Sequence, residues 1–263
     1  VMDTLNADVL GIIFQFIGEE KELRKMKLVS KEMNKMIKFK HLTKFKIIYS
    51  PIICHKYMLN YNFKNLRWLH YANNELTSLP FMPYLKGLYC AENQLTSLPL
   101  MPDLKILDCQ HNLLKSLPLM PELETLYCSD NKLTSIPAAL MPNLKTLSCS
   151  WNPLTLLPLM LNLEKLQCID NQLTSLPLMP NMKELYCTWN QLTSIPLMPN
   201  LIELKCYRNQ LTSIPLMQSL ETLWCSHNQL TSIPLMPYLK ELDAYDNQLP
   251  YVNIYDYKAF YKN

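Results

Sequence analysis

Apolar and polar residues follow a pattern that returns every nineteen residues over most of the chain. The copy at residues 201–217 is typical and reads Leu-Ile-Glu-Leu-Lys-Cys-Tyr-Arg-Asn-Gln-Leu-Thr-Ser-Ile-Pro-Leu-Met. An asparagine at position 9 marks ten copies: Asn74, Asn93, Asn112, Asn131, Asn152, Asn171, Asn190, Asn209, Asn228 and Asn247. The interval is 19 residues, except for 21 where Ala138 and Ala139 are inserted. Self-similarity at a short fixed period is typical of a solenoid.

The first nine positions of each copy predict a short strand followed by a turn. Positions 1, 4 and 6 are apolar and the positions between them are polar, which favours a strand with one buried face. Stacked copies then form one parallel sheet. The amide of Asn at position 9 both donates and accepts, so we expect it to pair backbone groups where the chain leaves the strand.

The second half of most copies reads Thr-Ser-Leu/Ile-Pro-Leu-Met-Pro, with two prolines within four residues. These prolines exclude a helix and predict an extended, polyproline-like arm on the convex side. We expect the methionine to face the core. The sequence leaves open the direction of the residue before it, which is Phe81 in the first copy and otherwise Leu100, Leu119, Leu140, Leu159, Leu178, Leu197, Leu216 and Leu235. If it points outward, the convex side carries an apolar stripe for self-association or for a partner.

Eight of the nine cysteines occupy position 6, from Cys90 in the second copy to Cys225 in the ninth. The first copy has Tyr71 there and the last has Ala244. A position that accepts Cys, Tyr or Ala is a packing position, so we expect a ladder of small buried side chains and no metal site. Stacked free thiols imply a reducing compartment, and we expect a cytoplasmic protein.

Written as L-x-x-L-x-C-x-x-N-x-L, the ten copies resemble the leucine-rich repeat, L-x-x-L-x-L-x-x-N-x-L. Their proline-containing arm is most similar to the short repeats of secreted bacterial effector proteins and of large-DNA-virus proteins. The resemblance implies an α/β repeat solenoid with one parallel sheet and an extended, non-helical convex side.

Residues 1–45 have helical spacing of their apolar positions, and we expect a small head of three short helices there. The helices are predicted over residues 5–17, over residues 20–29 and from Ser30 onward. The head resembles an F-box through two runs, Leu5…Asp8-Val9-Leu10…Ile13-Phe14…Phe16-Ile17 and Leu23…Leu28-Val29-Ser30-Lys31…Asn34. The proline and tryptophan usual in that motif are Asn6 and Met33 here.

The F-box resemblance implies that the head docks onto the F-box-binding adaptor of a cullin–RING (SCF-type) ubiquitin ligase. The docking residues it implies are Leu5, Val9, Leu10, Ile13 and Phe14. The alternative is a helical cap that only shields the first repeat. Between head and array, residues 46–65 are expected to serve as linker and N-terminal cap, with a strand over residues 45–49. The array spans residues 66–249, and residues 250–263 form a C-terminal cap or tail.

The copies differ mostly at positions 3, 5, 7 and 8, which we expect on the concave side. Aromatic residues gather at these positions in the later copies, and aromatics at exposed positions are typical binding anchors. The candidate partner-binding residues are Trp151, Tyr186, Trp189, Tyr207, Arg208, Trp224 and Tyr245. The alternative is cross-strand stacking that stabilises the sheet. Ten strands about 4.8 Å apart give a face of roughly 45 Å, which suits a protein partner.

Composition narrows the function classes. The net charge is +3, and the mixed charges at the variable positions do not form the basic stripe that nucleic acid requires. No apolar run reaches the ~20 residues of a membrane span. Three glycines in the chain and scattered histidines give no phosphate loop, nucleophile motif or cofactor site. We expect no enzyme activity, no cofactor and no membrane partner.

The head and the array together resemble the F-box plus leucine-rich-repeat proteins of giant, mimivirus-like viruses that infect amoebae. That resemblance implies a non-catalytic substrate receptor that holds a protein target on its concave face for ubiquitination, in the host cytoplasm if the chain is viral. The alternative is a stand-alone scaffold or a virion or host-interaction protein whose head is only a cap.

Overall fold

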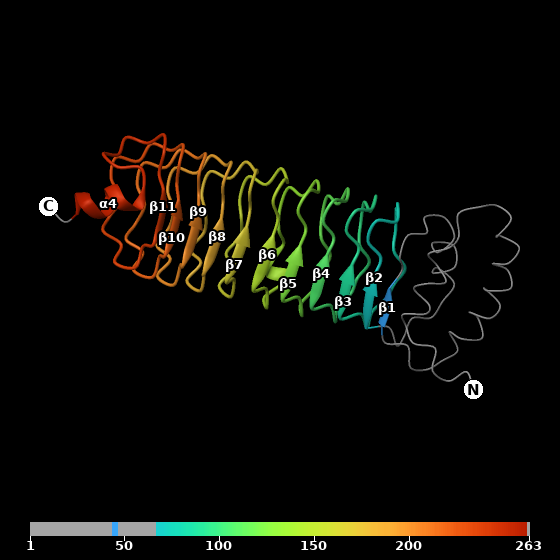
Figure 1. Cartoon of the computed structure of the whole chain (residues 1–263). Helices are drawn as coiled ribbons and strands as arrows, with labels where there is room; N and C mark the ends of the chain where they lie inside the picture. Colours follow the sequence, from blue (N-terminus) through green and yellow to red (C-terminus); the bar gives the residue numbers. More distant parts are fainter. Residues whose placement is uncertain (1–43, 47–66, 262–263) are drawn as a thin grey trace, which may run out of the picture.

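The computed structural model describes residues 44–46 and 67–261, which form one sheet of eleven parallel strands in chain order (Figure 1). The strands are β1 (Lys44–Lys46), β2 (Trp68–His70), β3 (Gly87–Tyr89), β4 (Ile106–Asp108), β5 (Thr125–Tyr127), β6 (Thr146–Ser148), β7 (Lys165–Gln167), β8 (Glu184–Tyr186), β9 (Glu203–Lys205), β10 (Thr222–Trp224) and β11 (Glu241–Asp243). Strands β2 to β11 correspond to the ten sequence copies, here called turns 1 to 10. The predicted parallel-sheet solenoid is confirmed.

Each strand consists of positions 3, 4 and 5 of its turn, and equivalent residues of neighbouring turns lie side by side. Leu204 of β9 is aligned with Leu223 of β10, and the two-residue insertion leaves Leu126 of β5 aligned with Leu147 of β6. The central leucine of every strand from β2 to β11 is buried. Identical side chains therefore stack in columns, and each turn buries its apolar face against its neighbours.

Five further columns complete the core. Leucine or methionine at position 1, cysteine at position 6, leucine at position 11, leucine or isoleucine at position 14 and methionine at position 17 are all buried in turns 2 to 9. The methionine prediction is thus confirmed, and so is the cysteine ladder, because the eight described cysteines are free and buried. The leucine before each methionine is exposed.

The asparagine at position 9 pairs backbone groups as predicted. The Nδ2 group of Asn190 donates to the carbonyls of Cys168, Cys187 and Thr188 at 2.9–3.2 Å, and its Oδ1 accepts from the N–H of Leu173 at 3.1 Å. One side chain thus joins two turns at the point where the strand ends. The preceding residue, at position 8, adopts a left-handed backbone in all ten turns, with φ between 50° and 57°.

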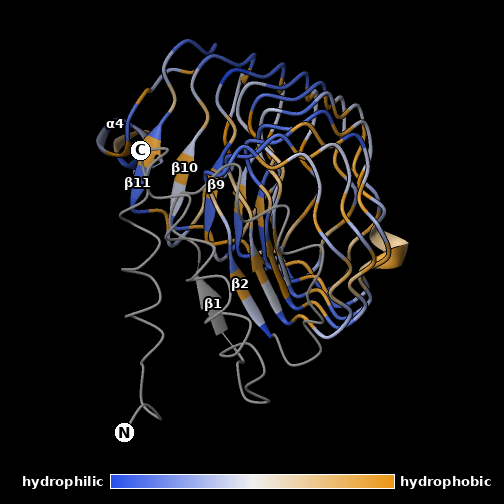
Figure 2. Cartoon of the chain, turned by 90° about the vertical axis from the view of Figure 1, so that its right-hand side faces the viewer, coloured by the Kyte–Doolittle hydropathy of each residue, from blue (hydrophilic) through white to orange (hydrophobic). Residues whose placement is uncertain are grey.

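The arms, at positions 12 to 18, form the side of the coil opposite the strands (Figure 2). Among residues 96–236, one backbone–backbone hydrogen bond joins neighbouring arms, from the N–H of Met120 to the carbonyl of Leu140 at 3.3 Å. The arms are extended, as the prolines predict, except for a 3-10 turn, η2 (Ala138–Leu140). This turn takes up the inserted Ala138 and Ala139. Because the described array contains no α-helix, β-solenoid describes it better than the expected α/β class.

The C-terminal end of the array is covered by Tyr251 and by helix α4 (Ile254–Phe260). The side chain of Asn253 caps α4 by accepting from the N–H groups of Tyr255 and Asp256. The Tyr251 hydroxyl accepts from the N–H of Ile233 at 3.1 Å, and the Tyr257 hydroxyl from that of Met236 at 2.7 Å. Two backbone donors of the arm of turn 9, which no further arm covers, are therefore paired with tyrosine hydroxyls.

At the other end, β1 pairs in parallel with β2, with Phe45 aligned with Leu69. The structure places this strand at Lys44–Lys46, so it overlaps the predicted strand over residues 45–49 only at its start. The predicted three-helix head, with its docking residues Leu5, Val9, Leu10, Ile13 and Phe14, lies outside the described residues.

Candidate functional site

The strand face is the surface formed by the side chains at positions 3, 5, 7 and 8, and it is the predicted concave face. Residues at positions 3 and 5 point away from the buried leucine between them, as expected for a strand with one buried side. All seven predicted partner-binding residues lie on this face in turns 5 to 10. The structure brings five of them together in turns 7 to 9.

Three consecutive residues at position 5 form a cation–aromatic stack across β8, β9 and β10. The Nζ of Lys205 lies 4.5 Å from the centroid of the Tyr186 ring and 4.2 Å from that of the Trp224 ring. The same Nζ is 2.8 Å from a carboxylate oxygen of Glu203. The parallel register places these side chains in a row, so one lysine contacts two aromatic faces.

The protonation states of this stack follow from its surroundings. Desolvation, together with a hydrogen bond to Glu203, raises the pKa of Tyr186 to about 12, so its hydroxyl stays protonated. Burial raises the pKa of Glu203, but its hydrogen bonds with Lys205 and Tyr186 outweigh that effect and lower the pKa overall. The carboxylate therefore stays charged beside the ammonium group.

A second cation–aromatic pair lies two columns away, at position 8. The guanidinium carbon of Arg208 lies 4.1 Å from the centroid of the Trp189 ring. Both residues have left-handed backbones, which turns their side chains outward at the end of the strand. Trp189 is 47% exposed, and Trp151, two turns earlier in the same column, is 53% exposed. Two indole rings in the same column, each about half exposed, offer a partner a large apolar contact area.

The two remaining predicted residues belong to the position 7 column. Tyr245 is exposed in turn 10, while Tyr207 is half-buried in turn 8. The intervening residue is Ser226, which is buried. The two tyrosines therefore lie two turns apart, with a buried serine between them.

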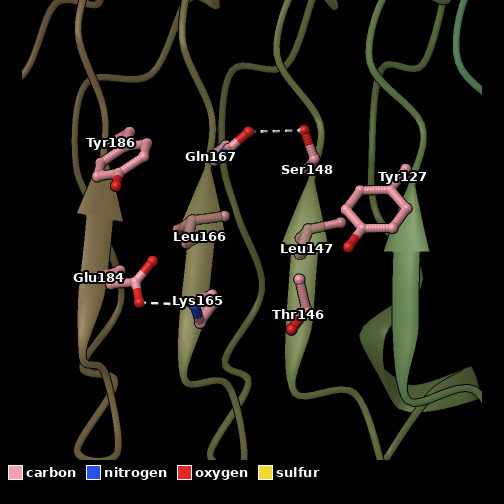
Figure 3. A pocket seen from close by; sticks show the side chains of 9 residues that line it. All are labelled: Tyr127, Thr146, Leu147, Ser148, Lys165, Leu166, Gln167, Glu184 and Tyr186. Carbon is pink, nitrogen blue, oxygen red and sulfur yellow. Dashed lines mark hydrogen bonds and ion pairs between the residues drawn. The ribbon is translucent and has the colours of Figure 1, made fainter.

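A hollow of about 190 Å³ interrupts the aromatic residues between Tyr127 of β5 and Tyr186 of β8 (Figure 3). On β6 and β7 the residues between them are small or polar, and the Ser148 hydroxyl donates to the side-chain oxygen of Gln167 at 3.2 Å. Three strand spacings separate the two rings by about 14 Å, which leaves room for a side chain or a chain segment of a partner. Lys165 and Glu184, joined by an ion pair of 2.6 Å, line one end.

The first two turns use their aromatic residues differently. The rings of His70 and Tyr89 stack across β2 and β3, with centroids 4.2 Å apart and an interplanar angle of 2°. The Trp68 ring covers Gly87, where an added Cβ would come within 2.2 Å of it. Here the alternative interpretation, cross-strand stacking, describes the structure well.

The charges of the strand face are predominantly acidic. Its carboxylates are Glu92, Asp108, Asp130, Asp170, Glu184, Glu203, Glu241, Asp243 and Asp246. Its lysines and arginines are Lys165, Lys205 and Arg208. Two histidines pair with acids of the next turn, His111 with Asp130 and His227 with Asp246, each at 2.7 Å. A surface of this sign repels phosphate and favours a partner that carries lysines and arginines.

The described residues offer little to other kinds of chemistry. Among them no group of three or more histidines, cysteines and acids is placed to hold a metal ion. Burial raises the pKa of the Cys149 and Cys187 thiols to about 12, which keeps these side chains protonated and unreactive. No helix in the described part of the chain has the length and apolar character to cross a membrane.

Sequence reasoning missed Lys205, Glu203 and the hollow. Their signal was present in the repeat, because residues 19 apart in one column become neighbours across the sheet. In turns 7, 8 and 9, position 5 is Tyr186, Lys205 and Trp224. This order places a cation between two aromatic rings. The gap between Tyr127 and Tyr186 can be read from the same column.

Comparison with known proteins supports the repeat assignment. A family model described as Leucine Rich repeats (2 copies) matches residues 121–159 and 199–235. The fold resembles a leucine-rich-repeat protein of Leptospira interrogans (TM-score 0.73, 29% identity, 83% of this chain and 64% of that chain). It also resembles YopM, a leucine-rich effector protein from Yersinia pestis (TM-score 0.66, 31% identity, 70% of this chain and 56% of that chain).

A third similar structure is the functional domain of InlJ from Listeria monocytogenes, which includes a cysteine ladder (TM-score 0.62, 29% identity, 66% of this chain and 42% of that chain). The chain thus spans between about two fifths and two thirds of the length of these three structures. A search of curated proteins gave no match. The array is therefore made of leucine-rich repeats similar to those of bacterial effectors, and the F-box and giant-virus resemblances stay predictions.

Proposed function

We propose that the chain is a non-catalytic protein-interaction module that binds a protein partner on its strand face, over turns 5 to 10. The observation that carries this proposal is the half-exposed pair Trp151 and Trp189, held outward in one column beside the cation–aromatic stack. Aromatic residues with adjacent cations are the side chains that most often dominate binding energy in protein interfaces.

The acidic surroundings define the partner further. A protein with exposed lysines and arginines complements the six carboxylates that the strand face carries in turns 5 to 10, and this attraction accelerates encounter and fixes orientation. The hollow between Tyr127 and Tyr186 accepts one protruding side chain or segment of that partner. Lys205 and Arg208 lie over aromatic rings, so these rings keep their conformation before the partner arrives.

Proximity labelling in the native cell, fused to the full chain, tests this proposal. We compare wild type with Trp151→Ser combined with Trp189→Ser, and with the control Gln172→Ser combined with Gln191→Ser. The control changes exposed residues of turns 6 and 7 outside the strand face. Proteins labelled by wild type and control but lost with the tryptophan variant support the proposal. Identical protein sets for all three chains would refute it.

At a finer level, we propose that the chain is a substrate receptor of a cullin–RING (SCF-type) ubiquitin ligase. The support for this role is the F-box-like sequence of residues 5–34, with Leu5, Val9, Leu10, Ile13 and Phe14 as the docking residues. In this role the head docks onto the adaptor in the cytoplasm, and the strand face presents the bound protein for ubiquitination. A giant-virus origin would place the receptor in the host cytoplasm.

A binding assay with the purified adaptor decides between the receptor and a stand-alone scaffold or virion protein whose head is only a cap. We expect the wild-type chain to bind and the Val9→Glu, Ile13→Glu variant to lose binding. No binding by wild type, or equal binding by the variant, would leave the scaffold as the function of the repeats.

A further inference from the structure

The arm face is the surface formed by the exposed side chains at positions 12 to 19, opposite the strands. At position 16 it presents an apolar residue in each of turns 1 to 9, while the next residue points inward. Leu178 is 55% exposed and Met179 is fully buried, and the same alternation holds for Leu197 and Met198. The direction that the sequence left open is thus outward, and nine apolar side chains follow one another along the array.

The arm face also lacks charge over a long distance. No aspartate, glutamate, lysine, arginine or histidine occurs in residues 133–143, 154–162, 173–181, 192–200, 211–219 and 230–238, which are positions 11 to 19 of turns 4 to 9. The strand face of the same turns carries seven aspartate, glutamate, lysine or arginine residues and one histidine within its four columns. Depletion of charge distinguishes the centre of protein interfaces from ordinary surface.

Turn 5 widens this apolar surface. Position 13 is Leu156 where eight other turns have serine, and position 18 is Leu161 where seven have proline. Both leucines are more than half exposed. We define the arm patch as the exposed leucines of turns 4 to 9, namely Leu140, Leu156, Leu159, Leu161, Leu178, Leu197, Leu216 and Leu235.

The area of the arm patch fits a protein interface. Eight leucines, each about half exposed, present on the order of 400 Å² of apolar side-chain surface, at roughly 50 Å² each. The largest apolar patch of a typical monomer covers about 300–600 Å². A standard interface buries about 800 Å² on each partner. Since a little over half of such an interface is apolar, one copy of the arm patch supplies most of the apolar area of one side.

The regular spacing of the patch points to its occupant. Position 16 recurs at the strand spacing of about 4.8 Å, with the same side chain in each turn. Interdigitation along such a ladder requires a second surface with the same period, and another copy of this chain has that period by construction. Two equal patches facing each other form an isologous, closed interface. The η2 turn in turn 4 interrupts the uniform ladder. A dimer in which one copy is shifted along the other by one turn therefore has different contacts, and this difference defines the register of the two copies.

We propose that two copies of this chain associate through their arm patches into a two-fold dimer, leaving both strand faces open. The contact is made by side chains, because the prolines of the arms and their extended backbone offer no continuous edge for strand pairing. The proposal is independent of what the strand face binds. Each dimer then displays two partner-binding faces that point away from each other.

Sedimentation velocity on the full-length chain at micromolar concentration tests the dimer. We compare wild type with Leu178→Glu combined with Leu197→Glu, and with the control Gln172→Glu combined with Gln191→Glu. Both variants add two negative charges to turns 6 and 7 at exposed positions. We expect wild type and control to sediment as dimers. The leucine variant should be monomeric, with dissociation at least ~100-fold more favourable because two carboxylates would be buried on each side.

Circular dichroism confirms that each variant is folded, which is expected because the substituted side chains are exposed. A wild-type monomer at about 50 µM, well above a typical micromolar dissociation constant, would overturn the proposal. A leucine variant that remains dimeric would overturn it as well. Flotation with phosphatidylcholine vesicles is the parallel measurement. A wild-type monomer that floats with the vesicles would assign the arm patch to a lipid surface and would also refute the dimer.

Discussion

The two sides of the coil are held together in different ways, and their sequences differ accordingly. On the strand side, parallel backbone pairing and the asparagine ladder join every turn to the next. On the arm side, backbone hydrogen bonds between neighbouring arms are almost missing over residues 96–236, and packing of side chains holds the turns. The exposed strand positions change from turn to turn, whereas the arms repeat nearly unchanged.

This contrast shows where a repeat protein can vary. Backbone pairing does not depend on the identity of an exposed side chain, so positions 3, 5, 7 and 8 are available for recognition. An arm without backbone pairing depends on the fit of identical side chains in stacked columns, so its sequence is repeated. Substitutions on the two sides should therefore have different costs.

The largest expected effect is alkaline unfolding, which acts on the thiols beneath the strands. Burial raises the pKa of all eight described cysteines, to about 12 for Cys149 and Cys187. In the unfolded chain the thiols ionise from about pH 9 upward. Because the pKa of each thiol is higher in the folded chain than in the unfolded chain, the protonated buried thiols stabilise the fold fully below pH 9. This contribution to the free energy of unfolding is lost as the pH rises towards 12. At about pH 10, ionisation of the eight thiols in the unfolded chain lowers the free energy of unfolding by a total on the order of 11 kcal/mol.

Urea unfolding measured from about pH 7 to pH 10 checks this expectation. The matched variant is Cys149→Ala combined with Cys187→Ala, which removes two of the eight thiols. Its loss of stability at about pH 10 should be smaller than that of wild type by roughly 3 kcal/mol. Equal pH dependence of wild type and variant would show that the thiols do not cause the loss.

The second prediction compares the two sides directly in neighbouring turns. Met179→Ala removes a fully buried arm-side residue and should lower the free energy of unfolding by about 3 kcal/mol, since truncation leaves a cavity. Gln167→Ala changes an exposed residue of β7 and should cost less than about 0.5 kcal/mol. Urea denaturation measures both. A larger cost for Gln167→Ala would reverse the proposed contrast between the sides.

The third prediction concerns the asparagine ladder. Asn190→Ala leaves three carbonyls and one N–H without their side-chain partner and should lower the free energy of unfolding by roughly 2 kcal/mol. The control is Asn200→Ala in the arm-to-strand turn, where the exposed amide makes one bond of 3.0 Å to the Pro180 carbonyl. It should cost about 0.5 kcal/mol or less. Equal costs in thermal unfolding would mean that the ladder does not join the turns.

The smallest effect is expected from the arm prolines. Pro196→Ala keeps an extended backbone in the folded arm but gives the unfolded chain more conformations, so stability should fall by about 0.5–1 kcal/mol. Ser194→Ala, two residues earlier and exposed, should change stability by less. Chemical denaturation of both variants checks the order. A stability gain in Pro196→Ala would show that the proline strains the arm.

Most of the array could be predicted because its period of 19 residues fixes which residues become neighbours. The parallel sheet, the inward methionines, the cysteine ladder and the bonds of the position 9 asparagine all follow from that period. The direction of Leu178 and its equivalents could not be read, because an extended arm has no fixed buried side until its turns are stacked. The left-handed backbone of Trp151, Trp189 and Arg208 had no signal either, since none of these residue types favours it.

The candidate site was predicted in part. The sequence placed Tyr186, Trp189 and Trp224 on one face, but the position of the Lys205 ammonium between two rings depends on side-chain rotamers that a pattern does not encode. The F-box-like docking residues, from Leu5 to Phe14, stay a prediction from the sequence.

The η2 turn has a practical consequence for changing the length of this chain. Two additional residues, Ala138 and Ala139, are taken up between β5 and β6, and both strands still pair in the common register. A turn of this coil thus tolerates lengthening on its arm side before the next strand begins. An epitope or a short reporter peptide inserted between Ala138 and Ala139 should leave the rest of the array intact, whereas an insertion beside a position 9 asparagine would separate that side chain from the backbone groups that it joins.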